Sequence, residues 1–347
     1  MAKVVGGFGS GHGPLMSLPG ELWGTRAEAD MRNPELVMMP EGRRVSYEDL
    51  LVHADPNIAK AINVETFNQK VESIQKGLNE LETRFGQTDM DVVVMFGDDQ
   101  SEWFFDDNYP TINIYWGESA KVLPRPSVPG SYRSYLTQEQ DWPVDSRLGL
   151  HVIESLMEED FDIAHSRYQK EAYGGSIGPA TWYLETKHST QPRAFGLPHA
   201  YGFPIGRWFN GKVVPILPIT INTCYPPNWI SPKRAYALGQ AVRRAIDAWD
   251  SDKKVAFACS GGLSHFVVDE ELDRKTMKAL GEADAETLTT LPRHRLQSAT
   301  TEILNWVATQ GAMGNVKMEG ITYEPGYRTP AGTGCGCAVG HWATNGS

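Results

Sequence analysis

The stretch at residues 253–265 constrains the fold most, because it joins a buried strand to a glycine turn and a histidine. Residues 255–259 read Val-Ala-Phe-Ala-Cys, a short apolar run typical of a strand buried on both faces. The run stops at Gly261-Gly262, and glycine adopts backbone angles that other residues avoid. His265 therefore follows the carboxyl end of a predicted central strand, where open α/β sheets bind ligands. It could act as an acid, a base or a metal ligand, or simply hydrogen-bond the backbone of its turn.

A second strand, glycine turn and histidine open the chain. Residues 4–8 form an apolar strand candidate, and His12 follows between Gly11 and Gly13. Glycine neighbours allow backbone and ligand to approach closely, which suits a metal ligand. The alternative is an incidental histidine in an N-terminal turn. Because the same arrangement occurs twice, a shared site is favoured.

Two further segments place acidic groups next to apolar ones. Residues 91–96 form another buried strand, and its carboxyl end carries Gly-Asp-Asp-Gln100-Ser-Glu102, either a solvated turn or a pocket wall. The predicted helix at 296–310 bears Glu302 beside Ile303 and Trp306. That carboxylate lies either at the solvated edge of the apolar stripe or in a buried site as a ligand.

The remaining periodicity predicts an α/β fold: a single domain spanning 1–347, with a central mixed β-sheet flanked by helices on both faces. Residues 17–90 are expected to form an elaboration near the active-site mouth, although 65–85 carry a clear amphipathic helix pattern. Further elements are expected at the following ranges: strands at 111–115 and 213–222, and helices at 147–160, 232–249 and 270–281.

Composition excludes several classes of protein. The chain is 41% hydrophobic and 22% charged, which is ordinary for a globular protein. A net charge of −11 argues against nucleic-acid binding, and no apolar run is long enough to span a bilayer. The first residues lack the pattern of a secretory signal, and four cysteines do not form a disulfide framework. We therefore expect a cytoplasmic protein.

Several motifs, taken in order, resemble the class III extradiol ring-cleavage dioxygenases, the family of the protocatechuate 4,5-dioxygenase β subunit. The matching motifs are Ser-Gly-His12-Gly-Pro-Leu, the strand 91–96 with its acidic turn, Phe161-Asp162, Gly-Leu-Pro-His199, Asn222 with Tyr225-Pro-Pro, Ser-Gly-Gly-Leu-Ser-His265 and Glu302-Ile-Leu-Asn-Trp306. The forms Gly-Asp-Asp-Gln100 and Tyr115-Trp-Gly-Glu118 look most like the single-chain branch that includes 3-O-methylgallate dioxygenases.

The resemblance implies roles for particular residues. His12 and Glu302 match the family's first iron ligand and its carboxylate ligand, His265 matches the acid–base histidine, and His199 matches a catalytic-pocket histidine near the substrate. Gln100 stands where the family has its second histidine ligand.

That departure leaves His53, Gln100 or Glu102 to complete the metal site. We predict His53, because the facial triad of non-haem Fe(II) enzymes uses two histidines and one carboxylate. Gln100 would then orient a ligand or the bound oxygen. The expected substrate-binding set is His199, Tyr201, Asn222 and Gln100.

The implied function is non-haem Fe(II)-dependent cleavage of a catechol- or gallate-type aromatic acid, similar to 3-O-methylgallate or protocatechuate, by O₂. The alternatives are another metal-dependent enzyme, such as a hydrolase, and a binding protein that has lost its metal. Expected partners are a small aromatic substrate and O₂, with no nucleic acid or membrane. We expect a homo-oligomer, with a dimer as the simplest form.

Overall fold

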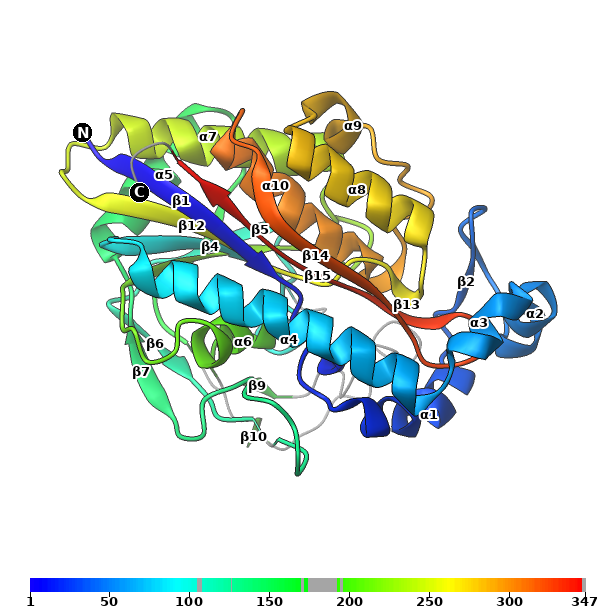
Figure 1. Cartoon of the computed structure of the whole chain (residues 1–347). Coiled ribbons are helices and arrows are strands. Elements are labelled where there is room, and N and C mark those ends of the chain that lie inside the picture. Colours follow the sequence, from blue (N-terminus) through cyan, green and yellow to red (C-terminus); the bar gives the residue numbers. More distant parts are fainter. Residues whose placement is uncertain (105–107, 126, 170–171, 174–191, 194–195, 345–347) are drawn as a thin grey trace.

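The chain folds around one large mixed sheet with helices on both faces, which confirms the predicted α/β class (Figure 1). The computed structural model describes residues 1–104, 108–125, 127–169, 172–173, 192–193 and 196–344. Within these residues the sheet has nine strands in the order β13-β15-β1-β12-β4-β11-β5-β8, and β14 pairs with β15. Its strands are β1 (Lys3–Ser10), β4 (Val92–Gly97), β5 (Ile112–Tyr115), β8 (Ala164–Ser166), β11 (Ile216–Ile221), β12 (Lys254–Ser260), β13 (His265–Val267), β14 (Met318–Tyr327) and β15 (Thr333–Ala343).

The centre of the sheet is parallel. β1, β12, β4 and β11 run in the same direction, whereas β15 is antiparallel to β1 and β5 is antiparallel to β11. The smaller hairpins are β2 (Val37–Met38) with β3 (Arg43–Arg44), β6 (Ser119–Val122) with β7 (Gln140–Pro143), and β9 (Ala172–Tyr173) with β10 (Pro192–Arg193). The predicted strands 255–259 and 91–96 are therefore confirmed as central elements, and the predicted strand 111–115 is confirmed as β5, next to the edge strand β8.

Alternate residues of the strands face two separate cores. Val92, Val94 and Phe96 of β4 join one core, and Val93 and Met95 join the other, as the two-residue period of a strand requires. The helices are α1 (Ala27–Met31), α2 (Tyr47–His53), α3 (Pro56–Ala61), α4 (Val64–Gln87), α5 (Ser146–Glu158), α6 (His199–Arg207), α7 (Pro232–Ala248), α8 (Glu270–Glu282), α9 (Ala285–Thr289) and α10 (Ile303–Met313), with 3-10 helices η1 (Pro14–Met16), η2 (Gly20–Arg26) and η3 (Ser298–Glu302). Helices α5, α7, α8 and α10 cover the first core, and α4 and α6 cover the second (Figure 1).

Helix α4 confirms the amphipathic pattern predicted at 65–85. The Asn63 side chain caps it by accepting a hydrogen bond from Thr66 N, and a stripe that includes Phe67, Val71 and Leu78 is buried. The helix lies against β14 and β15, so it belongs to the layer that covers the sheet. The shorter elements between η1 and α3 lie at the periphery (Figure 1).

The C-terminal hairpin β14–β15 was absent from the sequence expectations. β15 is buried along almost its whole length, yet its residues are mostly small, so the hydrophobic pattern is weak. Small size is needed there for packing: a Cβ at Gly336 would lie 2.2 Å from Asp273 Oδ2, and one at Gly340 would lie 2.7 Å from Met318 Sδ. The strand is therefore specified by close packing, which hydrophobic periodicity does not report.

Glu35 is a fully buried carboxylate in the peripheral segment. Its oxygens have no hydrogen-bond partner among the described residues, and Arg44 Nη1 lies 3.8 Å from Oε1. The segment around it contacts both η3 and the sheet. Ser298 Oγ of η3 donates weakly to Glu35 O at 3.5 Å, and β2 lies beside β13 of the sheet. Burial raises the pKa of Glu35 to about 7.

We expect Glu35→Gln to stabilise the protein at pH 8 and to have little effect at pH 4. The folded-state pKa lies above the ordinary 4.5, so wild-type stability falls as pH rises from about 4.5 to about 7 and is level above that. The loss is at most about 3–4 kcal/mol, from about 2.5 pKa units at 1.36 kcal/mol per unit. Urea unfolding at pH 4, 6 and 8 measures it, with exposed Glu48→Gln as control. A stability difference that did not change with pH would contradict this account.

Candidate metal centre and surrounding site

Three adjacent strands bring the predicted site residues to one edge of the sheet. β1, β12 and β4 are parallel neighbours, so their carboxyl ends meet. His12 follows β1 by two residues, Asp98 directly follows β4, and His265 comes after the glycine turn that ends β12. Glu302 ends η3 and enters from the helical layer immediately before α10. This confirms the predicted placement of two histidine turns at a common strand edge.

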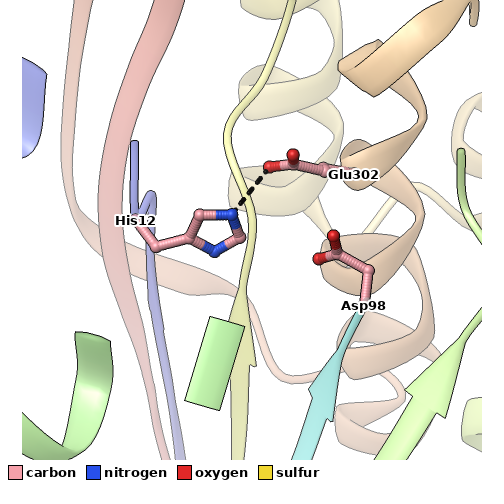
Figure 2. A group of neighbouring side chains, drawn as sticks. All are labelled: His12, Asp98 and Glu302. Carbon is pink, nitrogen blue, oxygen red and sulfur yellow. Dashed lines mark ion pairs between the residues drawn. The ribbon is translucent and has the colours of Figure 1, made fainter. Parts of the chain in front are cut away.

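His12, Asp98 and Glu302 form a buried cluster that could hold a metal ion (Figure 2). One potential ligand atom from each residue lies within 4.8 Å of the other two. His12 Nε2 is 3.3 Å from Glu302 Oε2, and all three residues are at most 4% exposed. This His12–Asp98–Glu302 cluster offers one imidazole nitrogen and carboxylate oxygens from two residues, a set suited to a divalent cation.

The electrostatics of the cluster favour bound positive charge. Burial disfavours a charged imidazole, but the Glu302 carboxylate outweighs it and raises the pKa of His12. Burial and then repulsion by Glu302 raise the pKa of Asp98 to about 7. Burial also opposes ionisation of Glu302, yet His12 and His265 hold the pKa of this carboxyl well below its ordinary value. His12 and Asp98 thus hold protons more tightly than usual beside the negative charge of Glu302. A divalent cation would displace those protons and neutralise the same negative charge.

Hydrogen bonds orient each member of the cluster. His12 Nδ1 shares a hydrogen bond of 2.9 Å with Ser260 Oγ, which leaves Nε2 directed toward Glu302. Gly262 N donates to Glu302 Oε2 at 2.5 Å, and Asn305 Nδ2 donates to Asp98 Oδ1 at 3.0 Å. Such partners commonly fix the direction of metal ligands.

Gln100 lies between the two carboxylates. Its Nε2 donates to Glu302 Oε1 at 2.7 Å and more weakly to Asp98 Oδ2 at 3.4 Å. An amide placed in this way stabilises the negative charge of both side chains. Its expected roles in orienting a ligand and in binding substrate stay predictions.

His265 has one ring nitrogen fixed and the other available. Nδ1 lies 2.8 Å from Leu263 O, and a carbonyl only accepts, so Nδ1 carries the hydrogen and Nε2 keeps a lone pair. Thr300 Oγ1 accepts from His265 N and donates to His265 O, which holds the backbone in place. The imidazole packs on Gly262, where a Cβ would lie 2.0 Å from the ring Cε1. Glycine at 262 therefore lets the ring reach the edge of the cluster.

His199 lies at the start of α6, on the opposite face of the sheet from α10, and contacts the cluster through His12. Its ring meets that of His12 edge-on, with centroids 4.4 Å apart. Glu102 Oε2 accepts hydrogen bonds from His199 Nδ1 at 2.6 Å and from His199 N at 3.0 Å. The acidic turn after β4 therefore positions His199, and Glu102 is not a member of the metal cluster.

His53 lies apart from the cluster, and the prediction that it completes the metal site is corrected here. It ends α2, which lies at the periphery (Figure 1). Its side chain is exposed, and its Nδ1 is 2.8 Å from Asp49 O of the same helix. Among the described residues Asp98 is the group that joins His12 and Glu302. The acidic turn was recognised in the sequence, but only folding showed which of its oxygen groups points inward.

Tyr201 and Asn222 use their polar atoms within the protein. Tyr201 is fully buried, and its hydroxyl hydrogen-bonds Thr220 Oγ1 at 2.9 Å. Asn222 accepts from Tyr225 N and donates to Tyr225 O, which shapes the turn after β11. Their expected contacts with substrate stay a prediction.

Two residues near the cluster were missed because they lie in the proline-rich segment 118–146. Tyr135 donates a long hydrogen bond of 3.5 Å to His12 O, and Arg125 forms an ion pair with Glu102. No local pattern distinguishes either residue from other loop residues. Their proximity to the cluster is a tertiary feature.

The fold and the cluster define an α/β protein with a candidate metal centre at the carboxyl edge of its sheet. The family model described as the catalytic LigB subunit of aromatic ring-opening dioxygenase matches residues 53–335. The chain therefore belongs to this family of class III extradiol dioxygenases, which confirms the resemblance seen in the motifs. His12 precedes the matched range.

Individual relatives are more distant. The chain is 30% identical to a gallate dioxygenase of Pseudomonas putida over 123 residues, which is 35% of this chain and 29% of the relative. It is 28% identical to a 2,3-dihydroxyphenylpropionate/2,3-dihydroxicinnamic acid 1,2-dioxygenase of Cupriavidus necator over 177 residues, which is 51% of this chain and 44% of the relative. The matches thus span less than half of these relatives. Among the described helices, none combines the length and apolar character that crossing a bilayer requires.

Proposed function

We propose that this protein is a metal-dependent extradiol dioxygenase that opens the ring of a catechol- or gallate-type aromatic acid with O₂, and that His12, Asp98 and Glu302 hold Fe(II). The observation that carries the proposal is the buried His12–Asp98–Glu302 cluster beside a histidine with a free ring nitrogen. Membership of the aromatic ring-opening family supports the reaction class. The named relatives act on gallate and on 2,3-dihydroxyphenylpropionate, which supports aromatic acids as substrates.

The donor set fits a ferrous ion, although it is richer in oxygen than two histidines and one carboxylate. Nitrogen and carboxylate oxygen both bind Fe(II), and the raised pKa values of His12 and Asp98 favour a cation at the cluster. When bound, the ion would supply the redox chemistry that lets O₂ react with a catechol. The chain's own groups supply positioning and proton transfer.

His265 is assigned the proton transfers. With Nδ1–H held by Leu263 O, Nε2 can accept a proton from a substrate hydroxyl and return it as the ring opens. His199 Nε2 faces the same region while Nδ1–H is held by Glu102, so it can accept a hydrogen bond from a ring substituent.

The reaction and the metal can be tested together. Protein purified without oxygen is analysed for bound metals, loaded separately with Fe(II), Mn(II) and Mg(II), and supplied with protocatechuate, gallate, 3-O-methylgallate or 2,3-dihydroxyphenylpropionate. We expect O₂ uptake with Fe(II), and a product that has gained both oxygen atoms by mass spectrometry. Absence of O₂ uptake with every substrate and metal would refute the proposal.

A second function is favoured by the two carboxylates. An oxygen-rich donor set also suits Mn(II) or Mg(II), both of which support metal-assisted hydrolysis. Tight binding of Mn(II) or Mg(II) without O₂ uptake would favour a hydrolase, and no binding of any metal would favour a binding protein.

We expect Asp98→Asn to weaken metal binding and His53→Ala to leave it unchanged. Asp98 is buried in the cluster, whereas His53 is exposed and distant from it. Because even partners of ligands are worth ~10–100-fold in metal affinity, we expect at least about 10-fold for Asp98→Asn. Titration of metal-free protein with Fe(II) under nitrogen measures both affinities. If only His53→Ala lost affinity, His53 would be the ligand and Asp98 would not.

A further inference from the structure

We propose that Arg125 binds the carboxylate of the aromatic substrate and so makes the enzyme selective for catechols that carry an acid group. This inference rests on the proposed function and names the residue that would select its substrate class. It concerns a residue from the segment that leads from β6 to β7, outside the strand ends that form the metal cluster.

One chain of contacts leads from Arg125 to the cluster through two residues. Arg125 Nη2 donates to Glu102 Oε1 in an ion pair. The other oxygen of Glu102 holds His199 at both its ring and its backbone nitrogen. The His199 ring lies against that of His12. Arg125 is therefore connected to the metal cluster by the ion pair and hydrogen bonds that position His199 and by the contact of that ring with His12.

A second, independent chain of contacts leads to the same place. The Arg125 guanidinium carbon lies 5.4 Å from the centre of the Tyr135 ring, within cation–π range. The Tyr135 hydroxyl donates to His12 O at 3.5 Å. Both routes end at His12, so Arg125 is linked to the metal cluster through Tyr135 on one side and through Glu102 and His199 on the other.

Arg125 retains the capacity to bind a carboxylate. Among the described residues only its Nη2 has a hydrogen-bond partner, so the N–H groups of Nε and Nη1 stay available. The side chain is 40% exposed and thus accessible to a ligand. A guanidinium presents its donors in a planar fork that matches a carboxylate, and such charge-assisted pairs are strong.

The acidic groups of the site favour a cationic partner for an anionic substrate. Asp98 and Glu302 belong to the metal cluster, and Asp99 and Glu102 stand in the same turn as Asp98. An aromatic acid that turned its hydroxyls toward the cluster would bring one more negative charge into this region. Arg125 would offset that charge at the end of the ring opposite the hydroxyls. A neutral catechol would gain nothing from the same contact.

The test compares protocatechuate with catechol, which lacks the carboxylate, in three variants. Arg125→Gln removes the charge, Arg125→Lys keeps it without the planar fork, and Lys121→Gln is the control. Lys121 lies on β6 and pairs only with Glu139 among the described residues. Dissociation constants are measured by calorimetry without oxygen on metal-loaded protein, and kcat/KM is measured by O₂ uptake.

We expect Arg125→Gln to weaken protocatechuate binding by about 10- to 100-fold, the usual loss for a hydrogen bond to a charged group, and to change catechol binding by less than about 2-fold. Arg125→Lys should fall between, and Lys121→Gln should match wild type. Equal losses for the two ligands, or an equal effect of Lys121→Gln, would overturn the inference.

The outcomes separate this inference from the function beneath it. If wild type binds both ligands and opens neither ring, the proposed function fails. The dissociation constants then still test whether Arg125 binds the carboxylate. If wild type opens both rings and Arg125→Gln does not discriminate between them, the function stands and the role of Arg125 is wrong. Wild type that binds neither ligand would refute both.

Discussion

Glu302→Ala is expected to purify without the metal and to lose ring-opening activity, whereas the fold remains intact. Glu302 is the centre of the cluster: it contacts His12, accepts from Gly262 N and Gln100, and repels Asp98. Its removal takes away a ligand and the charge that favours a cation. Because loss of a ligand's partner already costs ~10–100-fold in affinity, we expect metal affinity to fall by more than about 100-fold.

Metal content by mass spectrometry, Fe(II) affinity without oxygen, and O₂ uptake measure the effect, and circular dichroism checks the fold. Glu302→Gln is the matched variant, because it keeps the size of the side chain and removes its charge. It should bind metal almost as poorly as Glu302→Ala while disturbing packing less. Full metal content and turnover in both variants would remove Glu302 from the site.

His265→Gln is expected to keep the metal and to turn over substrate about 10²–10⁴-fold more slowly, the usual contribution of a positioned acid or base. Glutamine retains a side chain that can hydrogen-bond, but it does not take up a proton near neutral pH. His265 is not among the three residues of the cluster, and its Nδ1 is held by a backbone carbonyl. The change should therefore appear in kcat rather than in metal binding.

Single-turnover kinetics and Fe(II) affinity, measured side by side, would identify this role. His265→Gln should slow ring opening in a single turnover while its Fe(II) affinity matches that of wild type. His53→Ala, an exposed histidine, serves as the control and should match wild type. If His265→Gln arrived without metal, His265 would be a ligand and the cluster would need to be redrawn.

The hydrophobic pattern was sufficient to predict most of the elements that build the sheet. The apolar runs at 91–96 and 255–259 are strands buried on both faces, and the stripe at 65–85 is the buried face of α4. Burial of apolar surface stabilises these strands and this helix, so the pattern of apolar residues in the sequence shows where they form. The same runs showed where His12 and His265 lie, because a glycine turn after a parallel strand places its residues at one edge of the sheet.

Other features depended on contacts between distant residues. β15 consists mostly of small residues, because its backbone lies close to Asp273 and Met318. It therefore has no periodic hydrophobic pattern. Asp98, Gln100 and Glu102 are near neighbours in one turn, yet they face the cluster, bridge its carboxylates and hold His199, respectively.

The positions of Asp98 and His53 show why some features could be predicted from the sequence and others required the tertiary structure. Residue type told us that a histidine would suit the metal site, but the position of a side chain is set by the backbone that carries it. His53 ends a short peripheral helix and bonds to that helix, whereas Asp98 follows a central strand that ends beside β12. Local sequence thus determined the strands and the chemistry available at their ends, and the packing of those strands decided which three side chains share one buried space.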